Sequence, residues 1–351
     1  KSRDRSARSG LFSSPPSPGE WALCLSGQHA IMKERRSILG LKEEHFMAET
    51  IRGNFRSVTG QELEKRLWPA EGQPKAVVQF VHGMAEHIDR YDAPAKALNQ
   101  AGFIVVGHTH LGHGQNAAVK GYFADKDGWD ALIEDTNALR RETQAQYPAL
   151  PYFLLGHSMG SFVARTYCLK YEEGLAGAIF SGTGHFGKGI VTAGSAIAAI
   201  QCFFGGAQKP CMLLHHMNFS ANNQKVDNPQ TDSDWLTRDA EQVALYKADP
   251  LCGFPFTARA YADMFSGLRR LYPEHLSTMK KDIPVLLFAG DHDPVGSNGQ
   301  GVRQVYEEIK AAGVQDVTLK LYEGGRHEMF NEINREEVYA DLIGWLNSKL
   351  A

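Results

Sequence analysis

The sequence predicts an α/β protein in which helices cover both faces of a mostly parallel sheet and a helical cap is inserted in the second half of the chain. From Glu49 onward, short apolar runs typical of buried strands alternate with longer stretches whose apolar residues recur three and four positions apart. Such alternation is typical of a parallel sheet covered by helices. The interval from about Gly184 to Pro273 interrupts it, because this interval is too long for a simple crossover and contains no comparable strand run.

The expected elements follow one another along the chain. Two short strands, at residues 51–56 and 62–68, flank a Thr59-Gly60 turn and predict an opening hairpin. Buried strands are expected next at residues 76–81, 103–107, 152–155, 175–180, 283–288 and 317–321. Helices with one apolar face are expected at residues 129–146, 162–171, 302–312 and 338–350. The prediction is therefore a core of two parts, residues 47–183 and 274–351, and a cap, residues 184–273.

The first 46 residues differ from the rest of the chain. Arginine and serine alternate there and a Ser/Pro-rich stretch follows, without apolar periodicity. The apolar residues 21–25 are too few for a secretory signal, and acidic residues are unusual in a transit peptide. We expect residues 1–46 to be disordered or not to belong to the native protein. In the second case Met47 is the true start, since Lys42-Glu43-Glu44 can be encoded by a purine-rich ribosome-binding sequence.

The composition excludes several function classes. A share of 43% hydrophobic and 22% charged residues is that of an ordinary globular protein, and a formal net charge of −3 supplies no field to attract nucleic acid. The five cysteines are scattered without a Cys-x-x-Cys pair, which indicates neither a disulfide framework nor a thiolate metal site and fits a cytoplasmic protein. The longest apolar region, residues 190–204, is interrupted by polar residues, so we expect no membrane span. Nothing in the sequence indicates the oligomeric state.

The motif Gly156-His157-Ser158-Met159-Gly160 carries the clearest chemical signal. It follows the expected strand 152–155 directly and precedes a helical pattern. This is the context of a nucleophile elbow, a sharp turn in which side chains at the glycine positions would collide. We therefore predict Ser158 as a nucleophile that takes up an acyl group, and His157 as a packing residue. The alternative is a strand-to-helix turn that happens to contain serine.

A serine hydroxyl needs a base to remove its proton and a carboxylate to orient that base. In this kind of fold the chain order is serine, acid, histidine. His327 follows the last expected strand, 317–321, and is the predicted base. Asp291 and Asp293 both follow the strand 283–288 and are two positions apart, so in an extended chain their side chains would point to the same side. The sequence around them therefore does not decide which of the two is the acid.

The oxyanion of a tetrahedral intermediate needs N–H donors. The elbow supplies the backbone N–H of Met159, and Gly83 after the strand 76–81 lets the chain turn so that the N–H of Met84 points inward. An ordinary glycine turn is the alternative reading of that loop.

Together these residues resemble the α/β-hydrolase superfamily, and within it the monoacylglycerol lipases and lysophospholipases of the serine aminopeptidase-like (S33) group. The resemblance runs from about Phe55 to the end, apart from most of the cap. It rests on the elbow and on His82-Gly83-Met84-Ala85-Glu86-His87, Arg90-Tyr91, Gly112-His113-Gly114-Gln115, Gly290 with Asp293, and Tyr322-Glu323-Gly324 with His327. It implies Ser158 as nucleophile, Asp293 as acid, His327 as base, and Met84 and Met159 as oxyanion donors. The chain departs from the family at Thr109, Ala85 and Ser161, where the family usually has Asp, Gly and Gly.

Two further features have competing interpretations. His108, His110 and His113 are dense enough to suggest zinc, but the resembling family carries histidines in this loop without a metal, and we expect no metal and no cofactor. Apolar cap residues recur at near-helical spacing, which indicates cap packing, an acyl tunnel or a transient contact with a membrane surface: Ile190, Ile197, Ile200, Phe203 and Phe204.

The resemblance implies a serine carboxylic-ester hydrolase for fatty-acyl monoesters, with monoacylglycerol or lysophospholipid as the small-molecule substrate. A peptidase or thioesterase using the same residues remains an alternative, because acyl transfer does not reveal the leaving group. A non-catalytic ligand receptor on a hydrolase fold is a third interpretation. Dehalogenase or epoxide hydrolase chemistry is disfavoured, since it needs a carboxylate nucleophile at the elbow.

Overall fold

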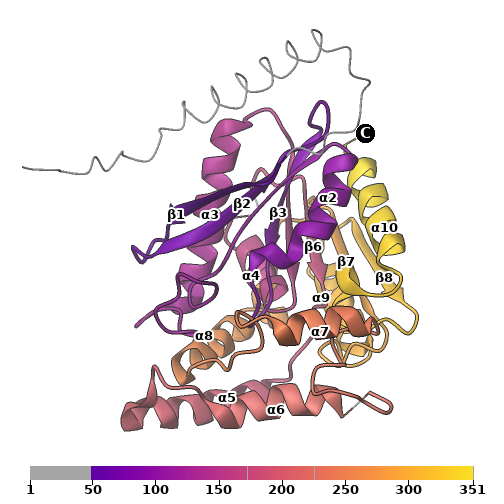
Figure 1. Ribbon diagram of the computed structural model, residues 1–351. Coiled ribbons are helices and arrows are strands. Elements are labelled where there is room, and N and C mark those ends of the chain that lie inside the picture. The colour runs from indigo at the N-terminus through magenta and orange to yellow at the C-terminus, as the bar shows by residue number, and fades with distance from the viewer. Residues whose placement is uncertain (1–48, 172, 225, 351) are drawn as a thin grey trace, which may run out of the picture. The chain divides into compact units, whose positions relative to one another are not determined.

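A computed structural model describes residues 49–171, 173–224 and 226–350 (Figure 1). It contains one eight-stranded sheet in the order β1-β2-β4-β3-β5-β6-β7-β8. The strands are β1 (Ile51–Arg56), β2 (Glu62–Trp68), β3 (Ala76–Val81), β4 (Phe103–His108), β5 (Tyr152–His157), β6 (Gly177–Ser181), β7 (Val285–Gly290) and β8 (Val317–Tyr322). The hairpin β1–β2 is antiparallel and joins β4 antiparallel, and the remaining pairs are parallel. The predicted α/β class is therefore confirmed. The predicted extension, residues 1–46, lies outside the described residues.

Helices cover both faces of the sheet. Apolar residues of α3 (Gly128–Gln146), α4 (Met159–Cys168) and α9 (Gln300–Ala311) belong to one buried cluster. Those of α2 (Asp92–Gln100) and α10 (Arg335–Ser348) belong to a second cluster on the opposite face. The inner strands β3, β5 and β7 are buried along their whole length, which explains why they are continuous apolar runs in the sequence. All parallel strands end at the same edge, where such sheets place their ligands.

The segment between β6 and β7 lies across that edge (Figure 1). It contains α5 (Lys188–Gln201), η2 (Cys202–Gly206), α6 (Met212–Asn223), α7 (Ala240–Ala248), α8 (Ala258–Arg269) and η3 (Pro273–Thr278). Its described residues contribute no strand to the sheet. The helix α8 packs closely on the core, since a Cβ at Gly267 would lie 2.1 Å from the indole of Trp129. The helix α5 packs in turn on α8, where a Cβ at Gly194 would lie 2.3 Å from the ring of Phe265.

The sequence led us to expect no segment apolar enough to span a membrane, and the segment Lys188–Gly206 differs from that expectation. By length and composition it is apolar enough to cross a membrane, with a mean hydropathy of 1.5. Only Lys188 and Gln201 are strongly polar, and the hydroxyl residues Thr192 and Ser195 lower the mean hydropathy only slightly. Because Gly194 packs against α8 while Phe203 and Phe204 are 85% and 79% exposed, the segment has one face on the domain and one apolar face outside. This amphipathic arrangement is typical of a surface helix rather than a spanning one.

Candidate active site

Ser158 lies in a strained turn between β5 and α4. Its backbone has φ 52° and ψ −122°, a conformation that L-residues adopt only when the surroundings impose it. The surroundings do so here, because a Cβ at Gly156 would lie 2.2 Å from the carbonyl oxygen of Gly160 and one at Gly160 would lie 2.0 Å from that of Val81. The two glycines therefore let the turn close against β3 and present the serine hydroxyl at the ligand edge of the sheet.

The side chains of Ser158, His327 and Asp293 form a continuous chain of hydrogen bonds. The Ser158 hydroxyl lies 2.8 Å from His327 Nε2, and His327 Nδ1 lies 3.0 Å from each carboxylate oxygen of Asp293. Asp293 is fully buried and His327 is 2% exposed. With Nδ1–H donating to the carboxylate, Nε2 is free to accept the serine proton.

The electrostatics of His327 suit a base. Burial alone lowers the pKa of the imidazole, but the carboxylate of Asp293 opposes this and brings the pKa above its ordinary value of 6.5. The neighbouring ring of His157 lies 4.9 Å from that of His327. Burial, followed by the charge of His327, lowers the pKa of His157 to about 3, so His157 stays neutral and packs against the His327 ring.

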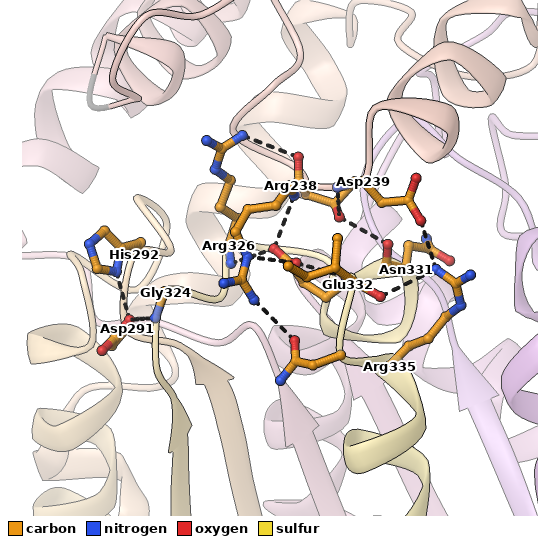
Figure 2. A network of polar contacts seen from close by, with 12 residues as sticks. Arg238, Asp239, Asp291, His292, Gly324, Arg326, Asn331, Glu332 and Arg335 are labelled. Carbon is orange, nitrogen blue, oxygen red and sulfur yellow. Dashed lines mark hydrogen bonds and ion pairs between the residues drawn. The ribbon is translucent and has the colours of Figure 1, made fainter.

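Asp291 occupies a different place from Asp293, although only two residues separate them. Its carboxylate accepts the backbone N–H of Gly324 at 2.7 Å and contacts Nδ1 of His292 at 2.6 Å (Figure 2). It thus holds the loop after β7 against the loop after β8, and the structure places Asp293 alone of the two against His327.

The loop of the expected oxyanion donor Met84 lies directly beside Ser158. A Cβ at Gly83 would lie 3.2 Å from Cβ of Ser158. Ala85 has φ 53°, and its N–H donates to Nε2 of His113 at 3.2 Å. The other expected donor, Met159, opens α4 next to Ser158. The structure therefore brings the loop of Met84 and the first residue of α4 next to Ser158.

The three histidines considered for zinc are buried, and one of them, His113, holds the backbone of the Met84 loop. Nε2 of His113 accepts from Ala85, and its Nδ1–H donates to the carbonyl of Leu111 at 2.9 Å. Burial lowers the pKa of His113 to about 4 and that of His108 to about 3, so both rings are neutral. His110 contributes its backbone N–H to Nε2 of His82 at 2.9 Å. A metal at Nε2 of His113 would have to displace the hydrogen bond that holds Ala85.

A buried network of ion pairs lies behind the site. Its residues Glu86 and Arg90 belong to the motif that carries the family resemblance, but the sequence did not show that they pair with each other and with Glu328. Arg90 pairs with Glu86 at 2.5 Å and with Glu328 at 2.6 Å, and the hydroxyl of Tyr91 donates to Glu86 at 2.8 Å. Burial raises the pKa of Glu328, but Arg90 outweighs that effect and lowers it to about 2. Glu328 directly follows His327, so this network holds the backbone next to the His327 side chain.

The cap residue Trp235 packs against the ring of His327. The sequence alone did not predict this contact. The indole of Trp235 lies 5.0 Å from the ring of His327 at an interplanar angle of 34°. The carbonyls of Trp235 and Leu236 accept the backbone N–H groups of His327 and Glu328 at 3.4 and 2.7 Å. We call residues 234–253 the cap clasp.

A buried carboxylate holds the cap clasp to the loop of His327 (Figure 2). Glu332 is completely buried and accepts from the side chain of Arg238 at 2.9 Å and from the backbone N–H of Arg326 at 2.9 Å. Arg335 pairs with Asp239 at 2.7 Å across the same boundary. The sequence of residues 235–239 does not predict these contacts, because their partners in the core lie about 90 residues further along the chain.

Comparison with known proteins agrees with this geometry. Residues 72–334 match the model of the hydrolase family described as serine aminopeptidase, S33. The chain is similar to a monoacylglycerol lipase of Mycolicibacterium smegmatis, at 29% identity over 85% of this chain and 97% of the relative. It is 27% identical to a monoglyceride lipase of Rattus norvegicus, over 83% of this chain and 89% of the relative. Among solved structures it resembles a highly thermostable carboxyl esterase from Bacillus coagulans in complex with glycerol, with a TM-score of 0.81 and 30% identity over 87% of this chain and all of that one.

Proposed function

This chain belongs to the serine aminopeptidase S33 family of α/β-hydrolases and is a serine ester hydrolase, and we propose that it cleaves fatty-acyl monoesters with Ser158 as nucleophile, His327 as base and Asp293 as acid. The observation that carries the assignment is the unbroken hydrogen-bond chain from the serine hydroxyl through the imidazole to a fully buried carboxylate. Few other arrangements deprotonate a serine at neutral pH.

The proposed reaction has two acyl-transfer steps. The Ser158 oxygen attacks the ester carbonyl while Nε2 of His327 takes its proton, and Asp293 stabilises the imidazolium that forms. The backbone N–H groups of Met84 and Met159 receive the developing oxyanion. The tetrahedral intermediate collapses, the C–O bond to the alcohol breaks, and His327 returns the proton to the leaving oxygen. Water, deprotonated by His327, then attacks the acyl-enzyme and releases the acid.

Monoacylglycerol is the substrate we favour. The mycobacterial and rat relatives carry that activity in their names and align with more than four fifths of this chain. Lysophospholipid is the second candidate, because it presents the same single acyl ester beside a polar head. A peptidase or thioesterase would use the same residues with a different leaving group.

The acid assignment is tested by two matched substitutions. Asp293→Asn removes the charge that stabilises the imidazolium and should lower kcat on p-nitrophenyl butyrate by about 10³- to 10⁴-fold. Asp291→Asn keeps most of the loop contacts and should leave kcat within about threefold of the wild type. The assignment is wrong if Asp291→Asn loses turnover while Asp293→Asn retains it.

The substrate is tested by a panel at equal acyl-chain length. Monoacylglycerol, lysophosphatidylcholine, a fatty-acyl thioester and a fatty-acyl amide differ only in the leaving group. We expect the highest kcat/KM for monoacylglycerol. A higher value for the amide or the thioester would replace the ester proposal by the corresponding alternative.

We also propose that the cap meets its lipid substrate at a membrane surface through an apolar arm, residues 188–217. Ile190, Phe203, Phe204 and Leu213 on this arm are all more than half exposed. Exposed aromatic and aliphatic side chains grouped on one helical segment bind the acyl boundary of a bilayer in proportion to the apolar area they bury there.

Vesicle sedimentation tests this contact. Replacing Phe203 and Phe204 by serine should weaken binding to phosphatidylcholine vesicles at least about tenfold, since burying one Phe contributes about 1.5–3 kcal/mol. Val58→Ser is the matched control, because Val58 is 57% exposed in the turn of the β1–β2 hairpin, outside the cap. Equal binding of the double variant and the control would contradict the proposal.

A further inference from the structure

A histidine, a carboxylate and a thiol meet where the cap clasp returns to the core. His87 comes from the loop of Met84, and Asp249 and Cys252 come from the turn after α7. Each residue offers one possible ligand atom: a ring nitrogen of His87, a carboxylate oxygen of Asp249 and Sγ of Cys252. These three atoms lie within 4.8 Å of one another. Nε2 of His87 is 2.8 Å from the Asp249 carboxylate. The chain separates His87 from the other two by more than 160 residues, so no local spacing shows this group.

We propose that His87, Asp249 and Cys252 bind a zinc ion. Imidazole nitrogen, carboxylate oxygen and thiolate sulfur are the three ligand types that zinc uses in proteins, and three such ligands with a water in the fourth position complete a tetrahedral site. The mixed donor set disfavours magnesium and calcium, which take oxygen ligands.

The surroundings of His87 fit a metal ligand. Nδ1 of His87 lies 3.9 Å from Oδ2 of Asp89. Histidines that bind zinc through one ring nitrogen commonly donate the other N–H to a carboxylate, which orients the ring and fixes its tautomer. When zinc occupies Nε2, the proton now shared with Asp249 leaves that atom and Nδ1–H faces Asp89.

The local charge also favours a dication. Arg90 is held between Glu86 and Glu328, and Arg66 and Arg52 pair with Asp89, so three positive and three negative charges balance. The carboxylate of Asp249 adds one negative charge. Binding releases one proton to solvent from the Cys252 thiol, because only the thiolate coordinates zinc, while His87 exchanges one tautomer for the other.

Zinc at this position connects the cap to the oxyanion loop. The N–H of Gly253 donates to the carbonyl of Ala85 at 2.9 Å, so the two segments are already joined beside the proposed ligands. A metal that draws His87 and Asp249 apart from their direct hydrogen bond shifts the loop that carries Met84. We therefore expect zinc to lower turnover of a soluble ester.

Cobalt substitution tests the site in the full-length protein. Titration with Co²⁺ should produce a near-ultraviolet thiolate-to-cobalt charge-transfer band that saturates at one ion per chain and disappears when Zn²⁺ is added. Cys252→Ser should abolish the band, and Asp249→Asn should weaken cobalt binding at least about tenfold. Cys202→Ser is the matched control, because Cys202 is a partly exposed cap cysteine of α5–η2 and should keep the band.

Metal-free turnover of p-nitrophenyl butyrate by Cys252→Ser, expected within about twofold of the wild type, shows that the variant is folded. The proposal is overturned if the wild type gives no charge-transfer band, if Cys252→Ser retains it, or if Cys202→Ser loses it. Inhibition by zinc that is undiminished in Cys252→Ser would place the inhibitory ion elsewhere, for instance on His327, and would overturn the proposed effect on turnover.

Discussion

The cap clasp and the apolar arm belong to the same insertion, yet they relate to the rest of the molecule in opposite ways. The clasp faces the catalytic edge and is held by buried polar contacts, with Glu332 joined to Arg238 and Trp235 packed on His327. The arm packs on the domain through Gly194 and exposes large apolar side chains such as Phe203. Through Trp235 and Arg238 the clasp thus holds the loop of His327, whereas the arm is an exposed apolar surface.

This difference has a physical basis. A buried carboxylate must keep its partners, because an uncompensated charge away from water is costly, so a clasp built on Glu332 resists separation from the core. An exposed apolar helix has no such constraint and lowers its free energy by meeting lipid or another apolar surface. We therefore expect substitutions of Trp235 and Arg238, the clasp residues that contact the loop around His327, to alter stability or catalysis on any ester. Substitutions in the arm should alter only encounters with lipid.

The largest difference between the two regions should be in stability. Arg238→Ala removes the side chain that neutralises buried Glu332 and should lower the free energy of unfolding by about 3–5 kcal/mol. Ile200→Ser in the arm, at a side chain that is 59% exposed, should change it by less than about 0.5 kcal/mol. Urea unfolding followed by circular dichroism measures both. Similar losses for the two variants would contradict the division of the cap.

The second difference should be in turnover of a substrate that needs no membrane. Trp235→Ala removes the ring beside His327 and should lower kcat on p-nitrophenyl butyrate by about 10- to 100-fold, because a small misplacement of the base is costly. Trp235→Phe should restore most of this activity by refilling the space. Phe203→Ala should leave kcat unchanged. If Trp235→Ala kept full turnover, the clasp would be a structural cover without influence on the base.

The smallest expected difference is in the pH profile. Since only neutral His327 can accept the serine proton, kcat/KM should fall as the pH falls through the pKa of His327, which lies above 6.5. Trp235→Ala admits water to the ring, relieves the effect of burial and should move this acid limb upward by less than about one pH unit. Phe203→Ala should leave it in place. A downward movement in Trp235→Ala would show that the indole does not act by excluding water.

The sequence predicted the core well for reasons that these contacts explain. Strands such as β3 and β5 are buried along their whole length and therefore appear as continuous apolar runs, and the elbow around Ser158 needs glycines at fixed spacing. The choice between Asp291 and Asp293 needed the family resemblance, because both follow β7 two positions apart. Only the conformation of the turn after β7 directs the Asp293 side chain to His327 and the Asp291 side chain to Gly324.

The contacts of the cap could not be read from the sequence. Trp235 and His327 are distant in the chain, and Arg238 and Asp239 of the cap clasp pair with the core residues Glu332 and Arg335. The same holds for His87, Asp249 and Cys252, which only the fold brings together. The spacing of residues in the sequence predicts secondary structure, but the Trp235–His327 contact and the group of His87, Asp249 and Cys252 join residues that are far apart in the chain.

The most direct test of the account is the site of covalent labelling by a fluorophosphonate, which reacts only with an activated serine. Peptide mapping by mass spectrometry should find one adduct, on Ser158, and Ser158→Ala should remain unlabelled and lose nearly all turnover. An active wild-type preparation that is not labelled, or an adduct on another serine that persists in Ser158→Ala, would contradict the assignment of Ser158 as the nucleophile.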